Sequence, residues 1–396
     1  MKKVFATLLM GISLTMFTGV ATAAPAQPIK IQFNGVNLSS DSAPVLKNGR
    51  TLVPVRLVSE TLGADVNWDG ATKTVTIIKN ADTVKLTINQ KATTKNGQPA
   101  QALEVPAEII NGKTYVPVRF VSEVLGAKVD WDNTNRAVKI QFEEKRDGMS
   151  PEELYNKSTT EMLKTDTYHM GGDLVMTVTV KDPSGQVPAI PLNANMTLNG
   201  DFKQSTTQFY LTGAASFMGE KLSGDMYFDG KNMYFKEAEQ EWVKTPDALS
   251  AEDLELIKKQ QDPEVAAQLL KELGIMPVFG NDVVIDGKEY YVLNIKIDSN
   301  KFMDLMRKSM EQSLAPMDAD AAEVEKILSS MKFDLTEKVY INKQTFVSDK
   351  VEVDATMNMD AEGLKVLVDM SGNLYVTNVG KAITFPTIPA DVKTLE

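Results

Sequence analysis

Alternating apolar and polar residues predict strands along much of this chain. Residues 29–33 read IKIQF, the period-two pattern of a half-buried strand, and Asn34-Gly35 closes it. Beyond residue 165 the alternating stretches become longer. They predict strands at 173–180, 192–202, 208–217 and 224–236, with a hairpin turn at Asp229-Gly230 in the last of these. Further strands are predicted at 283–297 and from 333 to 384.

Helical signals separate these strands into groups. Ser150, Pro151 and Glu153 form a capping box that starts a helix running to about residue 164. Further helices are expected after Ser250 and at 262–273, 301–314 and 319–331. The pattern therefore predicts an α+β fold, in which a large curved antiparallel sheet carries helices packed on one face.

A duplicated segment precedes the long strands. Residues 48–77 read NGRTLVPVRLVSETLGADVNWDGATKTVTI, and residues 111–140 read NGKTYVPVRFVSEVLGAKVDWDNTNRAVKI. At an offset of 63, 18 of the 30 aligned positions are identical, which indicates two copies of one structural module. We expect two small α+β units, at about 29–80 and 81–142.

Each copy predicts the same succession of a hairpin, a short helix and a second hairpin. Asn-Gly at 48–49 and 111–112 suits the positive φ angles of a type I′ turn. Pro54 marks the end of the returning strand, and Gly63 ends the short helix. A helix of about eight residues is unstable alone, so it must pack on the sheet that the hairpins form.

The two tryptophans, Trp68 and Trp131, alternate with valines on their strands. We expect both to lie in the core against the helix; the alternative is an exposed aromatic platform for sugars or peptides.

Arg56 and Arg119 begin the two helices, where the helix dipole disfavours a cation. Each arginine should therefore pair with a nearby carboxylate, from Glu60 or Asp69 in the first copy and from Glu123 or Asp132 in the second. We interpret six residues as structural: Arg56, Trp68, Asp69, Arg119, Trp131 and Asp132.

The pattern NG[RK]T-x-VPVR-x-VSE-x-LGA-x-V-x-WD resembles the copper amine oxidase N-terminal domain across residues 29–142. The resemblance implies a stalk or spacer module associated with the bacterial cell envelope. It does not imply amine oxidation, because those enzymes need three histidines for copper and a tyrosine in an Asn-Tyr-Asp/Glu context. The chain has one histidine, His169, and none of its ten tyrosines follows an asparagine.

The first residues have the pattern of an export signal. Lys2 and Lys3 precede the uncharged apolar stretch 4–20, and Ala21-Thr22-Ala23 is a small-x-small cleavage site. We expect residues 1–23 to be a cleaved signal peptide. The mature protein would then have no transmembrane anchor and would be secreted or extracellular. Association with the cell wall is compatible with this location.

Composition narrows the classes of partner. The formal charge is −11, and no cluster of Lys and Arg interrupts it, so nucleic acid is not an expected partner. The chain contains no cysteine, so an exported protein of this kind must be stable through packing alone.

A charged segment, EEKRDG at 143–148, predicts a linker at 143–149, and we interpret Glu143-Glu144 and Glu152-Glu153 as solvated. The following 150–396 is similar to LolA/LppX-like envelope proteins in its order of elements and in the segment from 227–230 to 242–244. That resemblance implies a curved sheet that wraps helices around an apolar cavity, in proteins that generally bind or carry lipid.

Methionine is the unusual feature of this second domain, since 17 of the 20 methionines lie at or beyond Met149. Flexible thioether side chains suit a deformable apolar pocket. The candidate pocket residues are Met176, Met196, Phe217, Met226, Phe228, Met303, Met306, Met357 and Met359. Two other interpretations stay open, namely an adaptable core without a ligand and Cu(I) binding by thioethers.

No motif of a nucleophile elbow, a phosphate-binding loop or a dinucleotide fold is present. We therefore predict an exported, non-enzymatic envelope protein without a cofactor. Its repeats would position it or attach it to a cell-wall polymer or an envelope protein, and its second domain would bind a hydrophobic or lipid ligand. The alternatives are a purely structural wall-associated scaffold and a methionine-based copper-binding protein.

Overall fold

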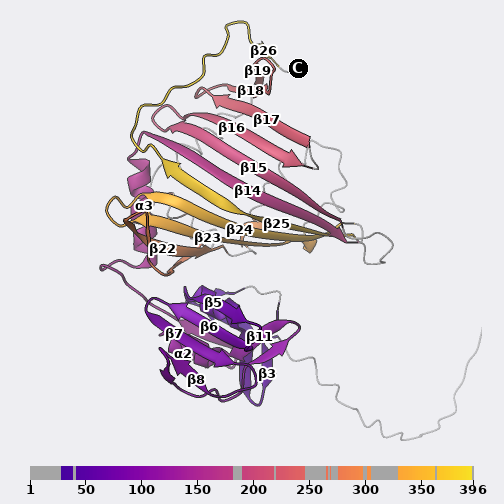
Figure 1. The fold of residues 1–396 in the computed structure, drawn as a ribbon, viewed down its shortest axis with the longest axis vertical. Helices are drawn as coiled ribbons and strands as arrows, with labels where there is room; N and C mark the ends of the chain where they lie inside the picture. The colour runs from indigo at the N-terminus through magenta and orange to yellow at the C-terminus, as the bar shows by residue number, and fades with distance from the viewer. Residues whose placement is uncertain are drawn as a thin grey trace, which may run out of the picture.

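The computed structural model describes residues 28–38, 42–181, 190–217, 220–245, 265, 268, 275–297, 301–304, 329–361 and 364–394. The expected signal peptide and most of the helices expected beyond residue 245 lie outside these residues. Residues 265, 268, 301–304 and 329–330 are helical, at positions where helices are predicted. The described part is mostly sheet, and it forms a small duplicated domain beside one large sheet (Figure 1).

Both copies of the repeat contain the predicted elements in the same order. The first contains β3 (Val45–Lys47), β4 (Arg50–Pro54), α1 (Val55–Thr61), β5 (Asp65–Asp69) and β6 (Thr74–Lys79). The second contains β10 (Glu108–Ile110), β11 (Lys113–Pro117), α2 (Val118–Val124), β12 (Lys128–Asp132) and β13 (Ala137–Gln141). The remaining strands are β1 (Lys30–Phe33), β2 (Val36–Asn37), β7 (Asp82–Thr87), β8 (Thr93–Lys95) and β9 (Gln98–Pro99).

The local signals act as expected. Asn48 and Gly49 have φ angles of 48° and 73°, and Asn111 and Gly112 have φ angles of 50° and 76°, which are the positive values that a type I′ turn requires. A proline ends both β4 and β11, and the helix begins at the next residue. These features depend on a few neighbouring residues only.

The two copies interlock instead of forming two separate units. Strand β4 pairs with β11 across the copies, and β1 runs parallel to β13 of the second copy. Strands β7, β8 and β9 extend the β5–β6 sheet of the first copy. One buried cluster contains residues of both copies, among them Val58 and Val121 of the two helices. A seven-residue helix cannot hold its shape alone, so this shared core stabilises both helices.

The second domain is one long sheet that begins with α3 (Pro151–Leu163). The predicted capping box is present, because Ser150 Oγ accepts from the Glu153 amide at 3.2 Å and the Glu153 carboxylate accepts from the Ser150 amide at 2.7 Å. Leu154 is fully buried against Leu293 and Ile341, so α3 covers one corner of the sheet.

The sheet order is β20-β22-β23-β24-β25-β14-β15-β16-β17-β18-β19-β26, with β21 paired to β22. Neighbouring strands are antiparallel apart from β19 and β26. Their bounds are β14 Thr167–Lys181, β15 Ile190–Lys203, β16 Gln208–Phe217, β17 Glu220–Phe228, β18 Met233–Glu237, β19 Val243–Thr245, β20 Met276–Phe279, β21 Val283–Ile285, β22 Lys288–Lys296, β23 Lys332–Asn342, β24 Ser348–Ala361, β25 Leu364–Thr377 and β26 Lys393–Thr394. The stretch 224–236 forms two strands, β17 and β18, on either side of the hairpin turn predicted at Asp229-Gly230, and the last predicted strand ends at Thr377 instead of 384.

The repeats dock at the β20–β22 edge of this sheet (Figure 1). Neighbouring residues of a strand point to opposite sides. For this reason, two neighbouring residues of β20 belong to two different buried clusters. Val278 belongs to the buried cluster of the repeats, while Phe279 belongs to the cluster under α3. The two domains are thus packed together through one strand.

Glycine is required where this strand meets the first repeat. Gly63, at φ +78°, ends α1, and a Cβ added there would overlap the carbonyl oxygen of Phe279. Gly126 occupies the equivalent position after α2 at φ +92°, where an added Cβ would lie 3.8 Å from the Phe142 ring. Both glycines therefore have a positive φ angle that strains other residues, but only Gly63 lies against the backbone of the sheet domain.

We predict that Gly63→Ala separates the domains, whereas Gly126→Ala does not. Both changes should destabilise the repeats by about 1–2 kcal/mol, because an L-residue is strained at positive φ. Only Gly63→Ala should also increase the radius of gyration of the full chain in X-ray scattering. An equal radius for the two variants would show that the Gly63–Phe279 contact does not hold the domains together.

Candidate functional sites at the domain junction and on the large sheet

A buried lysine lies at the junction of the repeats, the linker and the large sheet. Lys79, at the end of β6, is 7% exposed, and its Nζ donates to the carbonyl oxygens of Leu62 at 2.6 Å and Phe279 at 3.2 Å. The same Nζ lies 2.9 Å from the Glu144 carboxylate. Burial lowers the pKa of Lys79, and Glu144 opposes that shift. The ammonium group therefore donates two hydrogen bonds to carbonyl oxygens and forms an ion pair with Glu144.

The linker is part of this junction, so the interpretation of Glu144 as solvated is wrong. Its side chain is 16% exposed, and it also pairs with Arg146 at 2.8 Å. Arg146 bonds Asp282 and lies over the Phe279 ring at 4.6 Å. Glu144 thus contacts the repeats through Lys79, and Arg146 contacts the sheet domain through Asp282. The composition of the linker alone does not reveal these partners.

Sequence reasoning missed Lys79 although a signal for it exists. Strand β6 alternates, and its buried positions are Val75, Ile77 and Lys79. At the offset of 63 between the repeats, the counterpart of Lys79 is Phe142, and the Lys79 ammonium lies 5.1 Å from that ring. The comparison of the two repeats therefore singles out Lys79, because a charged residue stands where the other copy has an apolar one. In the structure, this is the position at which the first repeat contacts the sheet domain.

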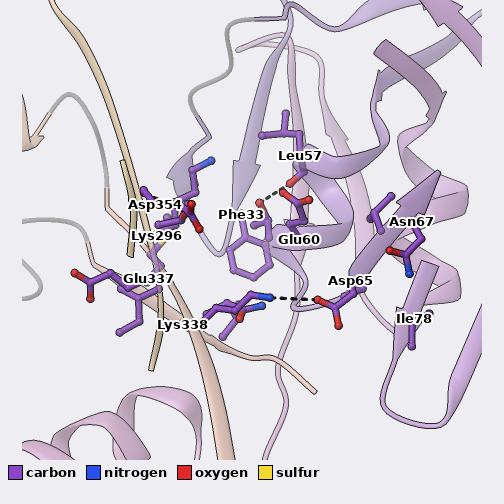
Figure 2. Close-up of a pocket in the computed structure, with 18 residues that line it drawn as sticks. Phe33, Leu57, Glu60, Asp65, Asn67, Ile78, Lys296, Glu337, Lys338 and Asp354 are labelled. Atoms are coloured by element: carbon purple, nitrogen blue, oxygen red, sulfur yellow. Dashed lines mark hydrogen bonds and ion pairs between the residues drawn. The ribbon is translucent and has the colours of Figure 1, made fainter. Parts of the chain in front are cut away.

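A pocket of about 410 Å³ opens beside this junction, between α1, β5 and the strands β22 and β23 (Figure 2). Figure 2 shows Phe33 and Leu57 beside Glu60, and Lys338 reaching toward Asp65. The apolar part of its lining comes from both domains: Phe33, Leu57, Val66, Ile78, Met276, Val278 and Ile295.

The charged groups of this pocket pair across the domain boundary. Lys338 Nζ lies 3.6 Å from the Asp65 carboxylate, and Asn281 donates to Asp65 at 2.7 Å. Burial raises the pKa of Glu60, while Arg56, Lys296 and Lys338 oppose that shift. Because most of its charges face one another, we interpret the pocket as part of the contact between the domains.

The register of the large sheet brings together the apolar residues singled out in the sequence. Met176 lies opposite Ala194 and Met370, and Met357 lies opposite Val368. Followed from strand to strand, these pairings place seven candidates on one face: Met176, Met196, Phe217, Met226, Phe228, Met357 and Met359. Met170 and Met370 lie on the same face, which we call the methionine face.

The methionines of this face are half-buried, whereas several residues of the opposite face are exposed. Met176, Met196 and Met357 are half-buried, but Asn195 and Asn358 on the opposite face are exposed. Aromatic rings continue the methionine face toward one end of the strands. The rings of Tyr168, Phe202, Phe209 and Phe228 follow one another at centroid distances of 4.9, 6.1 and 5.5 Å.

Three candidates need separate mention. Met303 is buried in the helical stretch 301–304, whose Phe302 stacks at 4.4 Å on Phe333 of the methionine face. Met306 lies outside the described residues, and Phe217 is described only as a backbone position in β16. Met357 and Met359 share a face, as a thioether pair for Cu(I) would need.

The expectation that both tryptophans are core residues is wrong. Trp68 is 43% exposed and Trp131 is 42% exposed. Strand alternation indicates which residues share a face, but the helices α1 and α2 pack on each other and on the valines and do not cover the indoles. Each tryptophan instead lines a groove.

The arginines at the helix starts face the expected glutamates. Arg56 lies 4.0 Å from Glu60, and Arg119 lies 3.7 Å from Glu123. Asp69 and Asp132 have a different role, because each accepts from backbone amides of its own turn. Hydrogen bonds lower the pKa of both carboxyls. The main cause is the Thr72 side chain for Asp69 and the Lys139 side chain, on β13, for Asp132, and the turn amides add to both shifts.

Within the part of the chain that the structure describes, no three or more His, Cys, Asp or Glu residues form a metal-binding group. No described helix is both long and apolar enough to cross a membrane. His169 bonds Asp201 through Nδ1 at 2.9 Å, and both side chains are half-buried on the face opposite the methionine face.

Two family models match the chain. The copper amine oxidase N-terminal domain matches residues 32–140, as the repeats led us to expect. A family of unknown function, DUF6612, matches residues 150–395, which is the large sheet with α3.

Among known proteins, a protein named protease inhibitor from Brevibacillus choshinensis is 32% identical over 126 residues. The match covers 31% of this chain and only 37% of that protein.

Similar solved structures include a lipoprotein and a LolA superfamily protein. One is the lipoprotein LppX of Mycobacterium tuberculosis, which is 13% identical with a TM-score of 0.29, and the match covers 58% of this chain and 95% of LppX. The other is a LolA superfamily protein from Nitrosomonas europaea, which is 10% identical with a TM-score of 0.18, and the match covers 60% and 96%.

We predict that Lys79→Met destabilises the full chain by about 3 kcal/mol, because it leaves Glu144 buried with one cation fewer. Urea unfolding measures this change. Adding Glu144→Gln should recover part of the loss, and Lys85→Met on the exposed side of β7 should have little effect. A similar small loss for both lysine variants would contradict a structural role of the buried ion pair.

The turn aspartates predict a pH dependence. Because the pKa values of Asp69 and Asp132 are lowered by folding, their contribution to stability is present above the unfolded pKa and is lost as the pH falls below about 4. The difference in urea midpoint between the wild type and Asp132→Asn should therefore shrink from pH 7 to pH 3. Asp130→Asn, on the same strand, is the control for loss of a charge without loss of the turn contacts. A difference that stays constant with pH would refute this role.

Proposed function

We propose that this chain, which belongs to the DUF6612 family of unknown function, is an exported and non-enzymatic envelope protein that binds a hydrophobic or lipid ligand. We divide it into a signal peptide at 1–23, a repeat domain at 29–142, a linker at 143–149 and a sheet domain at 150–396. The ligand would lie on the methionine face of the sheet domain. The repeats would position the protein or attach it to the cell wall.

The observation that carries the proposal is the placement of methionines by register. Residues far apart in the sequence, such as Met176, Met226 and Met357, meet on one face and are half-buried. Unbranched thioether side chains can repack around acyl chains of different lengths and shapes. A core that only needs to be filled is served better by branched residues with defined rotamers.

The energetics favour an acyl chain as the ligand. Each methylene group removed from water contributes about 0.8 kcal/mol, so a long chain can bind without a specific polar contact. The aromatic row from Tyr168 to Phe228 extends this surface along the strands. The opposite face carries exposed polar residues such as Asn195 and Thr356, which suits contact with water.

The junction supports a positioning role for the repeats. They contact the β20–β22 edge through Lys79, Asn281 and Val278, which is one end of the strand order, away from β14 to β17. The repeats would then act as a rigid base for the sheet domain.

We predict that a delipidated full chain binds a fluorescent fatty acid saturably, and that Met176→Lys weakens binding at least about tenfold. The cause is a charge on the apolar face, whose burial is costly. The matched control is Val175→Lys, one residue away on the opposite face, where Val175 is already 45% exposed. Fluorescence titration measures both variants, and circular dichroism confirms that they are folded.

The alternative scaffold makes a different prediction. If the methionine face is only a filled core, Met176→Lys lowers the unfolding temperature and the wild type shows no saturable binding. A copper-binding protein would bind Cu(I) in a competition titration and would lose that affinity in Met357→Leu combined with Met359→Leu. Either result in the absence of fatty-acid binding would overturn the proposal.

A further inference from the structure

The two exposed tryptophans line two grooves that are related by the duplication. The first groove, of about 700 Å³, contains Trp68, and the second, of about 370 Å³, contains Trp131. Each groove combines the helix and the tryptophan strand of one copy with the Asn-Gly hairpin of the other. Arg119 and Trp131 of the second copy thus lie with Arg50 of the first, and Arg56 and Trp68 lie with Lys113.

Twelve lining positions of one groove have an equivalent in the other groove at the offset of 63. The remaining lining residues, eight in the first groove and six in the second, differ between the two grooves. In the first groove all eight come from the sheet domain: Lys296, Met303, Met331, Lys332, Phe333, Asp334, Thr356 and Asn358. In the second groove all six come from the repeats: Ile29, Gln101, Ala102, Glu104, Asp130 and Arg136. The sheet domain therefore borders the groove of Trp68, while the groove of Trp131 is built by the repeats alone.

The second groove has the chemistry of a sugar site. A pyranose ring has a face of C–H groups, which packs on an indole, and a rim of hydroxyl groups, which bond to planar side chains that donate and accept. Trp131 supplies the exposed indole, and the polar groups around it are Arg50, Arg119, Arg136, Gln101, Glu104, Glu123 and Asp130. The volume is within the range of about 300–1,000 Å³ that small-ligand sites occupy.

The balance of charge narrows the class of sugar. Three arginines face three carboxylates along the groove, and Arg119 lies 3.7 Å from Glu123 while Arg50 pairs with Glu104. Neither a strongly anionic nor a strongly cationic polymer is favoured by such a lining. A ligand with many hydroxyl groups and no net charge fits it better.

We propose that the Trp131 groove binds an uncharged segment of a polysaccharide, through stacking of a sugar ring on the indole. This inference rests on the proposed attachment of the repeats to the cell wall and names the site that makes it. It is independent of the lipid ligand of the sheet domain. The Trp68 groove does not share the activity, because sheet-domain residues occupy its border.

The test is calorimetric titration of the full chain with chitohexaose and with cellohexaose. Trp131→Ala should weaken binding at least about tenfold, a factor that corresponds to ~1.4 kcal/mol. Trp68→Ala is the matched control, since the two indoles are equally exposed and occupy equivalent strand positions. Thermal unfolding of both variants should be similar, which separates loss of binding from loss of fold.

Three outcomes would overturn the inference. The first is absence of binding to both oligosaccharides, and the second is an equal loss of affinity in the two tryptophan variants. The third is binding of a synthetic wall stem peptide, abolished by Trp131→Ala, without binding of either sugar. Sedimentation with purified cell walls separates failure of this inference from failure of the proposed wall attachment. A chain that pellets with cell walls but does not bind either oligosaccharide supports wall attachment and contradicts only sugar binding at the Trp131 groove.

Discussion

The ammonium group of Lys79 connects the three parts of this molecule. It contacts a carbonyl at the end of α1, a carboxylate of the linker and a carbonyl of β20. A buried ammonium without three acceptors would be costly, so these segments must stay together for the charge to be tolerated. The same contact requires glycine at position 63, where β20 passes the helix end. The orientation of the large sheet relative to the repeats therefore depends on this residue.

The duplication explains why the junction is one-sided. The counterpart of Lys79 in the second copy is Phe142, an apolar residue that packs beside the Lys79 ammonium. A single substitution between equivalent positions thus gives one copy a partner and leaves the other without that charge. The groove of Trp68 borders the sheet domain, whereas the groove of Trp131 is lined by the repeats. The two copies can then serve different purposes on one shared core.

The large sheet separates two kinds of surface by the alternation of its strands. Its methionine face is continuous from β24 to β17 only because each pairing continues the register of the one before it. A slip of one residue at any pairing would move the methionines on one side of that pairing to the opposite face. The proposed lipid site and the solvated face are therefore consequences of one set of backbone hydrogen bonds.

Local features of this fold could be predicted from the sequence because a few neighbouring residues decide them. The Asn-Gly turns, the capping box at Ser150 and the helix end at Gly63 belong to this class. The sequence also determined which residues share a face of a strand, and hence the methionine set. Tertiary structure decided what covers each face, since Trp68 and Trp131 alternate like core residues but remain exposed. It also decided the role of Lys79 and Glu144, because the Lys79 ammonium contacts Glu144 of the linker and the carbonyl of Phe279, which is 200 residues away from Lys79.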